Sequence, residues 1–306
     1  MNVRVLLAAS VVLGLVSLPS AAQPLIQAPP AETHRLDSKA VGDAFEIRVM
    51  LPPMVQGETT RFPVVYMTDA NGGFPVSDDL LRLLMMSDVP RFIAVGIGYP
   101  AAKHFFQTGT IRQRDLTQVA MPPGQPSPFA GHISASVTSG ASAKFLEFVH
   151  DELMPFIDAR YPTNPADRAY FGHSLGGLFG LYTLFTRPNT FNRYIIGSPS
   201  IWWGSEDLFK IATQYMESHD DLPATVFMGI GALEEAPTSR MLTNMLKLET
   251  MLRAKKYRGL QLTTRIFADE GHVTVYGMNL TRGLVSVFGK PVPGEDVMSR
   301  FRALGK

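Results

Sequence analysis

The sequence predicts a single α/β domain whose central sheet is mostly parallel and carries helices on both faces. Three observations support this prediction. Apolar, β-rich runs alternate with helical patterns as far as residue 288. Several of the runs are apolar almost throughout, which is typical of strands buried on both faces. No internal repeat or linker divides the chain. Sustained alternation of strands and helices indicates a parallel sheet, because each crossover helix carries the chain back to the same edge.

The first 22 residues have the pattern of a cleaved signal peptide. Arg4 gives a short cationic start, residues 5–18 form an apolar run, and Pro19 and small residues lead to Ala22. This pattern directs secretion, and the run is shorter than the roughly 20 residues that span a bilayer. We therefore expect a periplasmic or secreted mature protein that is not bound to the membrane. A retained membrane anchor is the alternative.

Composition excludes several function classes. A formal net charge of +1 gives no electrostatic basis for binding nucleic acid or an anionic membrane. The absence of cysteine from the sequence excludes disulfides, thiolate metal sites and cysteine nucleophiles. The sequence holds neither an H-E-x-x-H motif nor clustered His and Asp ligands, so we expect no metal and no cofactor. The 45% of hydrophobic residues is sufficient for a sizeable core.

The elements of the first half follow a leader at residues 23–44, which is rich in Pro and Ala. The domain is expected to extend from residue 45 to residue 306. Short apolar runs predict strands at 45–51, 62–68 and 91–98. Helical spacing predicts a helix at 76–86. Glycines and prolines then break both periodicities at 99–140, and loops of this length are usually functional. We expect this insertion to form part of a pocket rim, with Phe105 among its substrate contacts, and a surface insertion far from the pocket is the alternative.

The second half resumes the alternation with clearer patterns. Apolar residues at a spacing of three to four predict an amphipathic helix at 141–161. The remaining strands are predicted at 168–172, 194–196, 224–230 and 261–267. The remaining helices are predicted at 175–185, 207–217, 239–256 and 273–288.

The segment GHSLGG at 172–177 lies between a predicted strand and a predicted helix. In that context G-x-S-x-G forms the nucleophile elbow of the α/β-hydrolase fold, which presents Ser174 above the sheet. Gly172 and Gly176 flank the serine because side chains there would clash with neighbouring elements. The free N–H groups at the helix N-terminus can stabilise negative charge. The alternative is an ordinary Gly-rich turn.

An elbow serine needs a base and an acid, which follow it along the chain in this fold. His272 comes directly after the strand at 261–267 and is the expected base. His219, the other downstream histidine, lies in a polar stretch and is expected to face solvent. The acid should follow the strand at 224–230, where Glu234 and Glu235 are adjacent.

Adjacent residues point in different directions, so only one of these two carboxylates can serve. We favour Glu234, with Asp207 as a third candidate. For the oxyanion hole we expect the amide of Leu175, next to the nucleophile. A second donor should come from the loop after the strand at 62–68, where Ala70 is the first candidate and Asn71 the second.

Six motifs together resemble a known family. They are TDANGGF, VGIGY, RQRDLT at 112–117, GHSLGG, GSPSIWW at 197–203 and DEGHVTVY at 269–276. In this order the sequence resembles the esterase D-like esterases of the α/β-hydrolase fold, most of all the branch of enterochelin esterases and siderophore trilactone hydrolases. The resemblance implies that Ser174 and His272 are the catalytic serine and histidine of the family. It also implies that Glu234 is the acid, because members often have a G-x-x-E stretch after the equivalent strand. One feature departs from the family: members usually have an Asp-Gly pair after the early strand, whereas here Asp69 is followed by Ala70.

Substrate contacts are expected from residues near the predicted pocket. Trp202 and Trp203 follow the strand after the elbow and offer aromatic walls to an acyl group, although we expect one of the two to pack in the core instead. Arg112 and Arg114, in the long insertion, are candidates for contacting an anionic chelate, and solvent-exposed side chains are the alternative for both.

The sequence thus predicts a serine esterase that cleaves small-molecule esters through an acyl-enzyme, with siderophore lactones and other acyl or aromatic esters among the candidate substrates. A secreted acyltransferase of the same fold and a non-catalytic binding protein are the alternatives. A binding protein has no need for an intact set of serine, histidine and carboxylate, which argues against the last reading.

Overall fold

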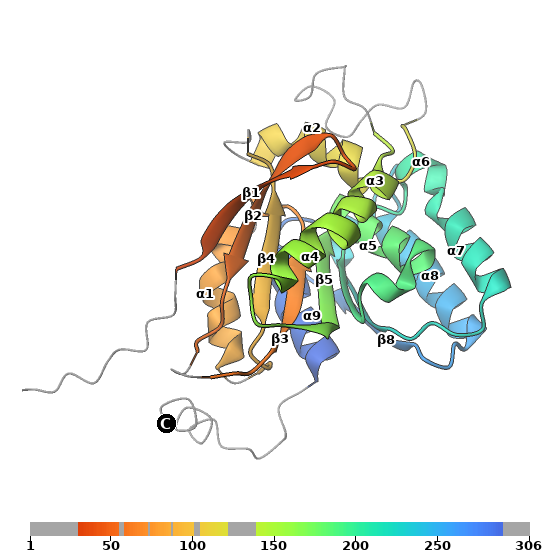
Figure 1. The fold of residues 1–306 in the computed structure, drawn as a ribbon. Coiled ribbons are helices and arrows are strands. Elements are labelled where there is room, and N and C mark those ends of the chain that lie inside the picture. Colours follow the sequence, from red (N-terminus) through yellow and green to blue (C-terminus); the bar gives the residue numbers. More distant parts are fainter. Residues whose placement is uncertain are drawn as a thin grey trace, which may run out of the picture.

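A computed structural model describes residues 30–54, 58–72, 74–86, 88–100, 105–121 and 139–289 of the chain. The predicted signal peptide and residues 23–29 of the leader lie outside these ranges. In the described part, one sheet of eight strands has the order β1-β2-β4-β3-β5-β6-β7-β8 and organises the molecule (Figure 1). No helix of the described residues has the length and apolar character needed to cross a membrane.

The sheet is mostly parallel, as predicted. β1 pairs antiparallel with β2, and β2 pairs antiparallel with β4, whereas every other neighbouring pair is parallel. The strands are β1 (Glu32–Ser38), β2 (Asp43–Met50), β3 (Phe62–Met67), β4 (Ile93–Gly98), β5 (Thr163–His173), β6 (Arg193–Gly197), β7 (Thr225–Gly231) and β8 (Gln261–Phe267).

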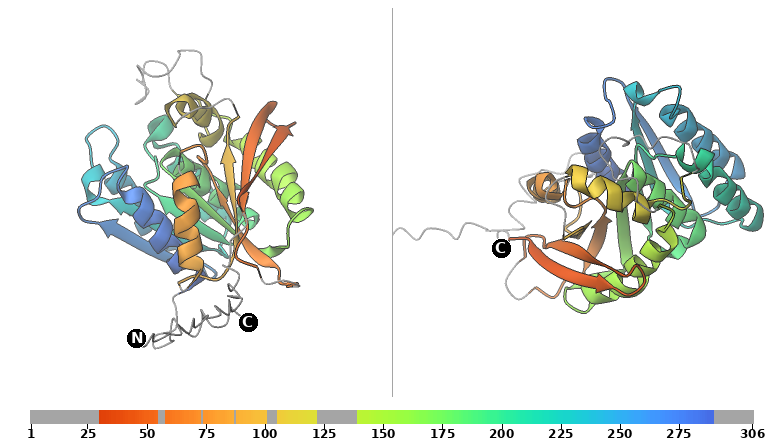
Figure 2. Two further views of the ribbon diagram at one scale, coloured as in Figure 1. Left: turned by 90° about the vertical axis from the view of Figure 1, so that its left-hand side faces the viewer. Right: turned by 90° about the horizontal axis from the view of Figure 1, so that it is seen from above.

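Helices cover both faces of this sheet (Figure 2). The helices are α1 (Phe74–Met85), α2 (Phe105–Leu116), α3 (Ser142–Glu147), α4 (Met154–Asp158), α5 (Leu175–Thr186), α6 (Trp203–Glu206), α7 (Leu208–Ser218), α8 (Met241–Lys255) and α9 (Val275–Phe288). A π-helical segment, η1 (Phe148–Leu153), joins α3 to α4. Two short 3₁₀ helices are η2 (Pro188–Thr190) and η3 (Ala232–Glu234).

Side chains that alternate along the strands divide the core into two layers. On β6, Tyr194 and Ile196 point into the layer that α3, α5, α7 and α8 cover. Ile195, between them, points into the layer that α1 and α9 cover. Because successive strand residues face opposite sides, a strand buried on both faces is apolar at every position. This is the reason that β3, β4 and β6 could be predicted from sequence.

Two predicted boundaries are wrong. The leader was expected to reach residue 44, yet β1 and the start of β2 lie within it. β1 is an edge strand with a mostly exposed, polar sequence, so it lacks the apolar run that marks an inner strand. The span 99–140, expected to be irregular, contains α2, whose buried side chains include Arg112, Gln113 and Asp115. Because α2 buries polar side chains, apolar periodicity in the sequence does not reveal it.

The strand order determines where the functional side chains meet. β5, β6, β7 and β8 are consecutive neighbours and run parallel, so their carboxyl ends lie along one edge of the sheet. Ser174 follows β5, the turn 197–200 follows β6, Glu234 ends η3 after β7, and His272 follows β8. Open α/β sheets bind their ligands at this edge.

Candidate active site

Ser174 occupies the sharp turn between β5 and α5 that the sequence predicts. Its φ of 61° and ψ of −118° are unusual for a residue with a side chain, and such strain is concentrated at functional positions. The flanking glycines are needed for close approach. A Cβ on Gly172 would lie 2.3 Å from the carbonyl oxygen of Gly176, and one on Gly176 would lie 2.5 Å from Thr68 Oγ1.

The strained backbone of Ser174 is held by neighbours on two sides. Its N–H donates to the carbonyl of Gly197 at 2.9 Å. Its own carbonyl accepts from the N–H of Ser200 at 3.1 Å and from that of Leu178 at 3.0 Å. The turn after β6 therefore fixes both polar groups of the serine backbone.

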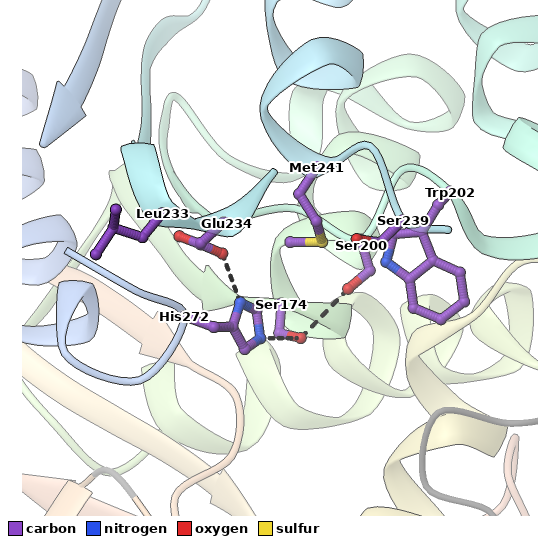
Figure 3. Close-up of a pocket in the computed structure, with 8 residues that line it drawn as sticks. All are labelled: Ser174, Ser200, Trp202, Leu233, Glu234, Ser239, Met241 and His272. Carbon is purple, nitrogen blue, oxygen red and sulfur yellow. Dashed lines mark hydrogen bonds and ion pairs between the residues drawn. The ribbon is translucent and has the colours of Figure 1, made fainter. Parts of the chain in front are cut away.

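Three predicted side chains form a hydrogen-bonded chain at this site (Figure 3). His272 Nε2 lies 3.0 Å from Ser174 Oγ, and His272 Nδ1 lies 2.6 Å from Glu234 Oε2. The Glu234 side chain is 2% exposed, whereas the His272 ring is 44% exposed. A carboxylate accepts the proton of Nδ1, which leaves Nε2 free to accept from the serine hydroxyl. This is the arrangement of a nucleophile, a base and an orienting acid.

The choice between the two adjacent glutamates follows from their hydrogen bonds. Glu234 Oε1 accepts from Ser198 Oγ at 2.7 Å and from the Gly231 N–H at 2.8 Å, so Oε2 is aimed at His272. Glu235 instead accepts from the hydroxyl and the N–H of Thr243 at the start of α8. These bonds hold the pKa of Glu235 below its usual range. Asp207 forms an ion pair with Lys210 at 3.3 Å.

One of the two expected oxyanion donors is wrong. Leu175 begins α5 directly after the nucleophile, as predicted. The N–H of Ala70, however, donates to the carbonyl of Ile97 at 3.1 Å and is engaged in the fold. Asn71 is the other candidate in this loop. Its side chain bonds both the N–H and the carbonyl of Tyr99, at 2.7 and 3.0 Å, and this ties the loop to the end of β4.

Arg112 does not contact the pocket, contrary to the prediction. It is 3% exposed and forms two bonds to Asp69, from Nε at 2.7 Å and from Nη2 at 2.8 Å. Nη2 also lies 3.4 Å from the carbonyl of His173. A bidentate, buried pair of this kind holds two segments in register. Arg112 therefore connects the loop after β3 to the residue that precedes Ser174.

A pocket of about 300 Å³ opens beside Ser174. Its lining consists of Ser174, Ser200, Trp202, Leu233, Glu234, Ser239, Met241 and His272 (Figure 3). Trp202 thus lies where the sequence predicts. Trp203 does not, because it is fully buried and its Nε1 donates to the carbonyl of Val119 at 2.9 Å. None of the described side chains between 99 and 140 lines this pocket, and the side chain of Phe105 lies outside the described residues.

His173 is a site residue that sequence reasoning missed. Its Nε2 donates to the carbonyl of His272 at 2.8 Å, and the two rings are 4.8 Å apart. Burial, together with the neighbouring His272, lowers the pKa of His173 to about 3. A neutral His173 therefore supports the loop that carries the base. Its place inside GHSLGG was visible, but its partner 99 residues away was not.

The described residues contain no group of three or more His, Asp or Glu side chains that could hold a metal ion. The donors at the site are instead those of nucleophilic catalysis.

Comparisons with known proteins identify the family of the chain. Residues 38–276 match the model of a family described as "Putative esterase". Ferri-bacillibactin esterase BesA of Bacillus subtilis is 29% identical over 263 residues, which cover 84% of this chain and 89% of the relative. Siderophore triacetylfusarinine C esterase of Aspergillus fumigatus is 29% identical over 276 residues, with 81% and 89% covered. The solved structure of the BES protein from Bacillus cereus is similar with a TM-score of 0.74 and 26% identity, and the match covers 87% of this chain and 98% of that one. The chain therefore belongs to this esterase family, the carboxylic ester hydrolases of the α/β-hydrolase fold.

Proposed function

We propose that this protein is a serine esterase that hydrolyses small-molecule esters through an acyl-enzyme on Ser174, with His272 as base and Glu234 as the orienting acid. The observation that carries the proposal is the continuous chain of hydrogen bonds from Glu234 through His272 to the strained serine. A structural serine would need neither the strain nor both partners.

In acylation, His272 Nε2 takes the proton of Ser174 Oγ while Oγ forms a bond to the ester carbonyl carbon. The carbonyl oxygen becomes an oxyanion, for which the N–H of Leu175 is a donor. The tetrahedral intermediate then expels the alkoxide, which takes the proton from His272. In deacylation, water gives a proton to His272 and attacks the acyl carbon. Ser174 Oγ then leaves and recovers the proton from His272, and the carboxylic acid product is released.

The pocket supports an acyl group with an apolar or aromatic part. Trp202, Met241 and Leu233 provide most of its apolar lining, and aromatic walls favour flat, apolar groups. A volume of about 300 Å³ is at the lower end of ligand pockets, so a large cyclic ester would leave much of itself outside. The names of the relatives, a ferri-bacillibactin esterase and a triacetylfusarinine C esterase, support siderophore esters as the substrate class.

Replacement of the nucleophile tests this proposal. Ser174→Ala is expected to abolish hydrolysis of short p-nitrophenyl esters and of siderophore lactones, with unchanged circular dichroism, because nucleophile loss reduces the rate by many orders of magnitude. A fluorophosphonate probe should label the wild-type protein at Ser174 alone. Labelling at another residue, or turnover retained in the variant, would overturn the assignment.

We also propose that residues 1–22 direct export of the chain, on the basis of the cationic start, the apolar run and the small-residue exit. N-terminal sequencing of the protein from its native host should begin at Gln23. A chain that still carries Met1 or the apolar run would contradict this proposal.

A further inference from the structure

The turn at 197–200, which begins at the last residue of β6, contacts both ends of the hydrogen-bonded chain described above. Ser198, at a φ of 41°, donates from Oγ to Glu234 Oε1 at 2.7 Å. Two residues later, Ser200 Oγ lies 3.2 Å from Ser174 Oγ. Ser200 is 2% exposed as a whole residue, yet it lines the pocket (Figure 3). A second buried hydroxyl therefore faces the reacting oxygen.

The direction of the bond between the two hydroxyls follows from the available protons. His272 Nδ1 carries a hydrogen because its neighbour, at 2.6 Å, is the carboxylate of Glu234. In the neutral ring Nε2 must then accept, and the hydroxyl 3.0 Å away is that of Ser174. A serine has one hydroxyl proton. Because Ser174 donates its proton to His272, Ser200 must be the donor in the bond to Ser174 Oγ.

The position of this donor is set by the backbone and not by a side-chain rotation alone. The N–H of Ser200 binds the carbonyl of Ser174 at 3.1 Å, and the carbonyl of Gly197 binds the N–H of Ser174 at 2.9 Å. The turn and the elbow thus form one unit, and the Ser200 hydroxyl stays next to Oγ when the bonds of Oγ change.

We propose that Ser200 is a further catalytic residue, whose hydroxyl donates a hydrogen bond to Ser174 Oγ and stabilises that oxygen when it acts as a leaving group. This inference rests on the proposed function, because it assumes an acyl-enzyme on Ser174. In that intermediate Oγ is the ester oxygen. A donor there withdraws electron density and makes the acyl carbon more susceptible to attack by water.

The two half-reactions should respond differently to this bond. In deacylation, water attacks, the bond between Oγ and the acyl carbon breaks, and the electron pair returns to Oγ, which His272 protonates. The Ser200 hydrogen bond strengthens as that pair arrives. In acylation the same pair attacks the carbonyl carbon, and a donor on Oγ lowers its nucleophilicity. Loss of the hydroxyl should therefore slow deacylation more than acylation.

Ser200→Ala tests this prediction with p-nitrophenyl acetate as substrate. A hydrogen bond to a group that develops charge corresponds to a rate effect of about tenfold to a hundredfold. We expect the deacylation rate to fall by that factor, while the fraction of enzyme found as acyl-enzyme at steady state rises. Acid quenching followed by intact-mass spectrometry measures this fraction, and the peptide that carries the acetyl group should contain Ser174.

Two variants serve as comparisons. Ser198→Ala removes the hydroxyl that positions Glu234, so it should slow both half-reactions and leave the acylated fraction near that of the wild type. Ser142→Ala removes a fully buried hydroxyl in α3, away from the pocket, and should leave the kinetics unchanged. Thermal melts of all variants report on folding.

The outcomes separate this proposal from the proposed function. If acetyl forms on Ser174 but Ser200→Ala has the wild-type rate, or slows both half-reactions equally, the assignment of Ser200 is overturned and the esterase mechanism stands. If no acyl group forms on Ser174, or Ser174→Ala retains turnover, the mechanism itself fails.

Discussion

Glu234→Gln changes one atom of the carboxylate, and the structure determines which way the new amide must lie. Glu234 Oε1 accepts hydrogen bonds from Ser198 Oγ and from the N–H of Gly231. The N–H of Gly231 can only donate, so the amide oxygen of the glutamine must take the place of Oε1. The NH₂ group then replaces Oε2, 2.6 Å from His272 Nδ1.

This orientation gives His272 the wrong tautomer. An NH₂ group donates, so Nδ1 must become the unprotonated nitrogen and Nε2 must carry the proton. Nε2 can then no longer accept from Ser174. The analogous substitution in a serine protease lowers kcat by about 10⁴-fold. We expect a loss of about 10³- to 10⁴-fold here, equivalent to about 4–5.5 kcal/mol of transition-state stabilisation.

Steady-state hydrolysis of a p-nitrophenyl ester measures the effect, with Glu235→Gln as the matched control. Glu235 contacts Thr243 and lies away from His272, so kcat should be unchanged in that variant. Fluorophosphonate labelling of Glu234→Gln should slow in parallel with kcat, because labelling also needs Nε2 as base. A Glu234→Gln enzyme within tenfold of the wild type, or a larger loss in Glu235→Gln, would refute the reasoning.

Two further predictions follow from buried groups near the elbow. Arg112→Met should lower the free energy of unfolding by about 3–5 kcal/mol, because it leaves the Asp69 carboxylate buried without its partner. Urea denaturation measures this free energy. A variant with normal stability and a raised KM would instead support a substrate-binding role for Arg112. His173 is neutral in the folded state, with its pKa lowered to about 3, whereas the unfolded chain takes up a proton below about pH 6.5. Stability should therefore fall as the pH drops from 6.5 towards 3, by at most about 1.4 kcal/mol per pH unit from this group. His173→Asn should show a shallower dependence in urea melts at pH 5 and pH 7, and an equal slope in both proteins would contradict the assignment.

Much of the fold could be predicted because its signals are local. β3, β4 and β6 are apolar at nearly every position since helices cover both of their faces. The elbow could be predicted because Gly172 and Gly176 have no room for a Cβ. Chain order then left two histidines as candidate bases, and the position of His272 directly after a predicted strand favoured it over His219. For the acid, the end of a strand offered a pair of adjacent glutamates, with Asp207 as a third candidate.

The remaining features depend on contacts between segments far apart in the sequence. Arg112 was predicted to contact substrate or solvent because nothing near it in the sequence reveals its partner, Asp69, which lies 43 residues earlier. The sequence indicated that one of the two adjacent tryptophans packs in the core but not which one. Trp203 is that one, because its indole N–H donates to the carbonyl of Val119, 84 residues before it. The N–H of Ala70 donates to the carbonyl of Ile97, near the end of β4. A buried guanidinium or indole N–H needs a hydrogen-bond acceptor. Here the acceptors lie far away in the sequence, so no local pattern could identify them.

The sequence by itself thus determined the α/β architecture and the place of Ser174 in a strand–turn–helix elbow, and it predicted His272 as the base, because periodicity and the need for small residues in a tight turn are visible in neighbouring residues. Only the tertiary structure decided that Glu234 and not Glu235 meets His272, and that Ser198, Ser200 and His173 surround the site. The carboxyl ends of β5, β6, β7 and β8 come together through strand order and register. Which side chains then lie within hydrogen-bonding distance is a property of the assembled sheet, since each partner is contributed by a different strand.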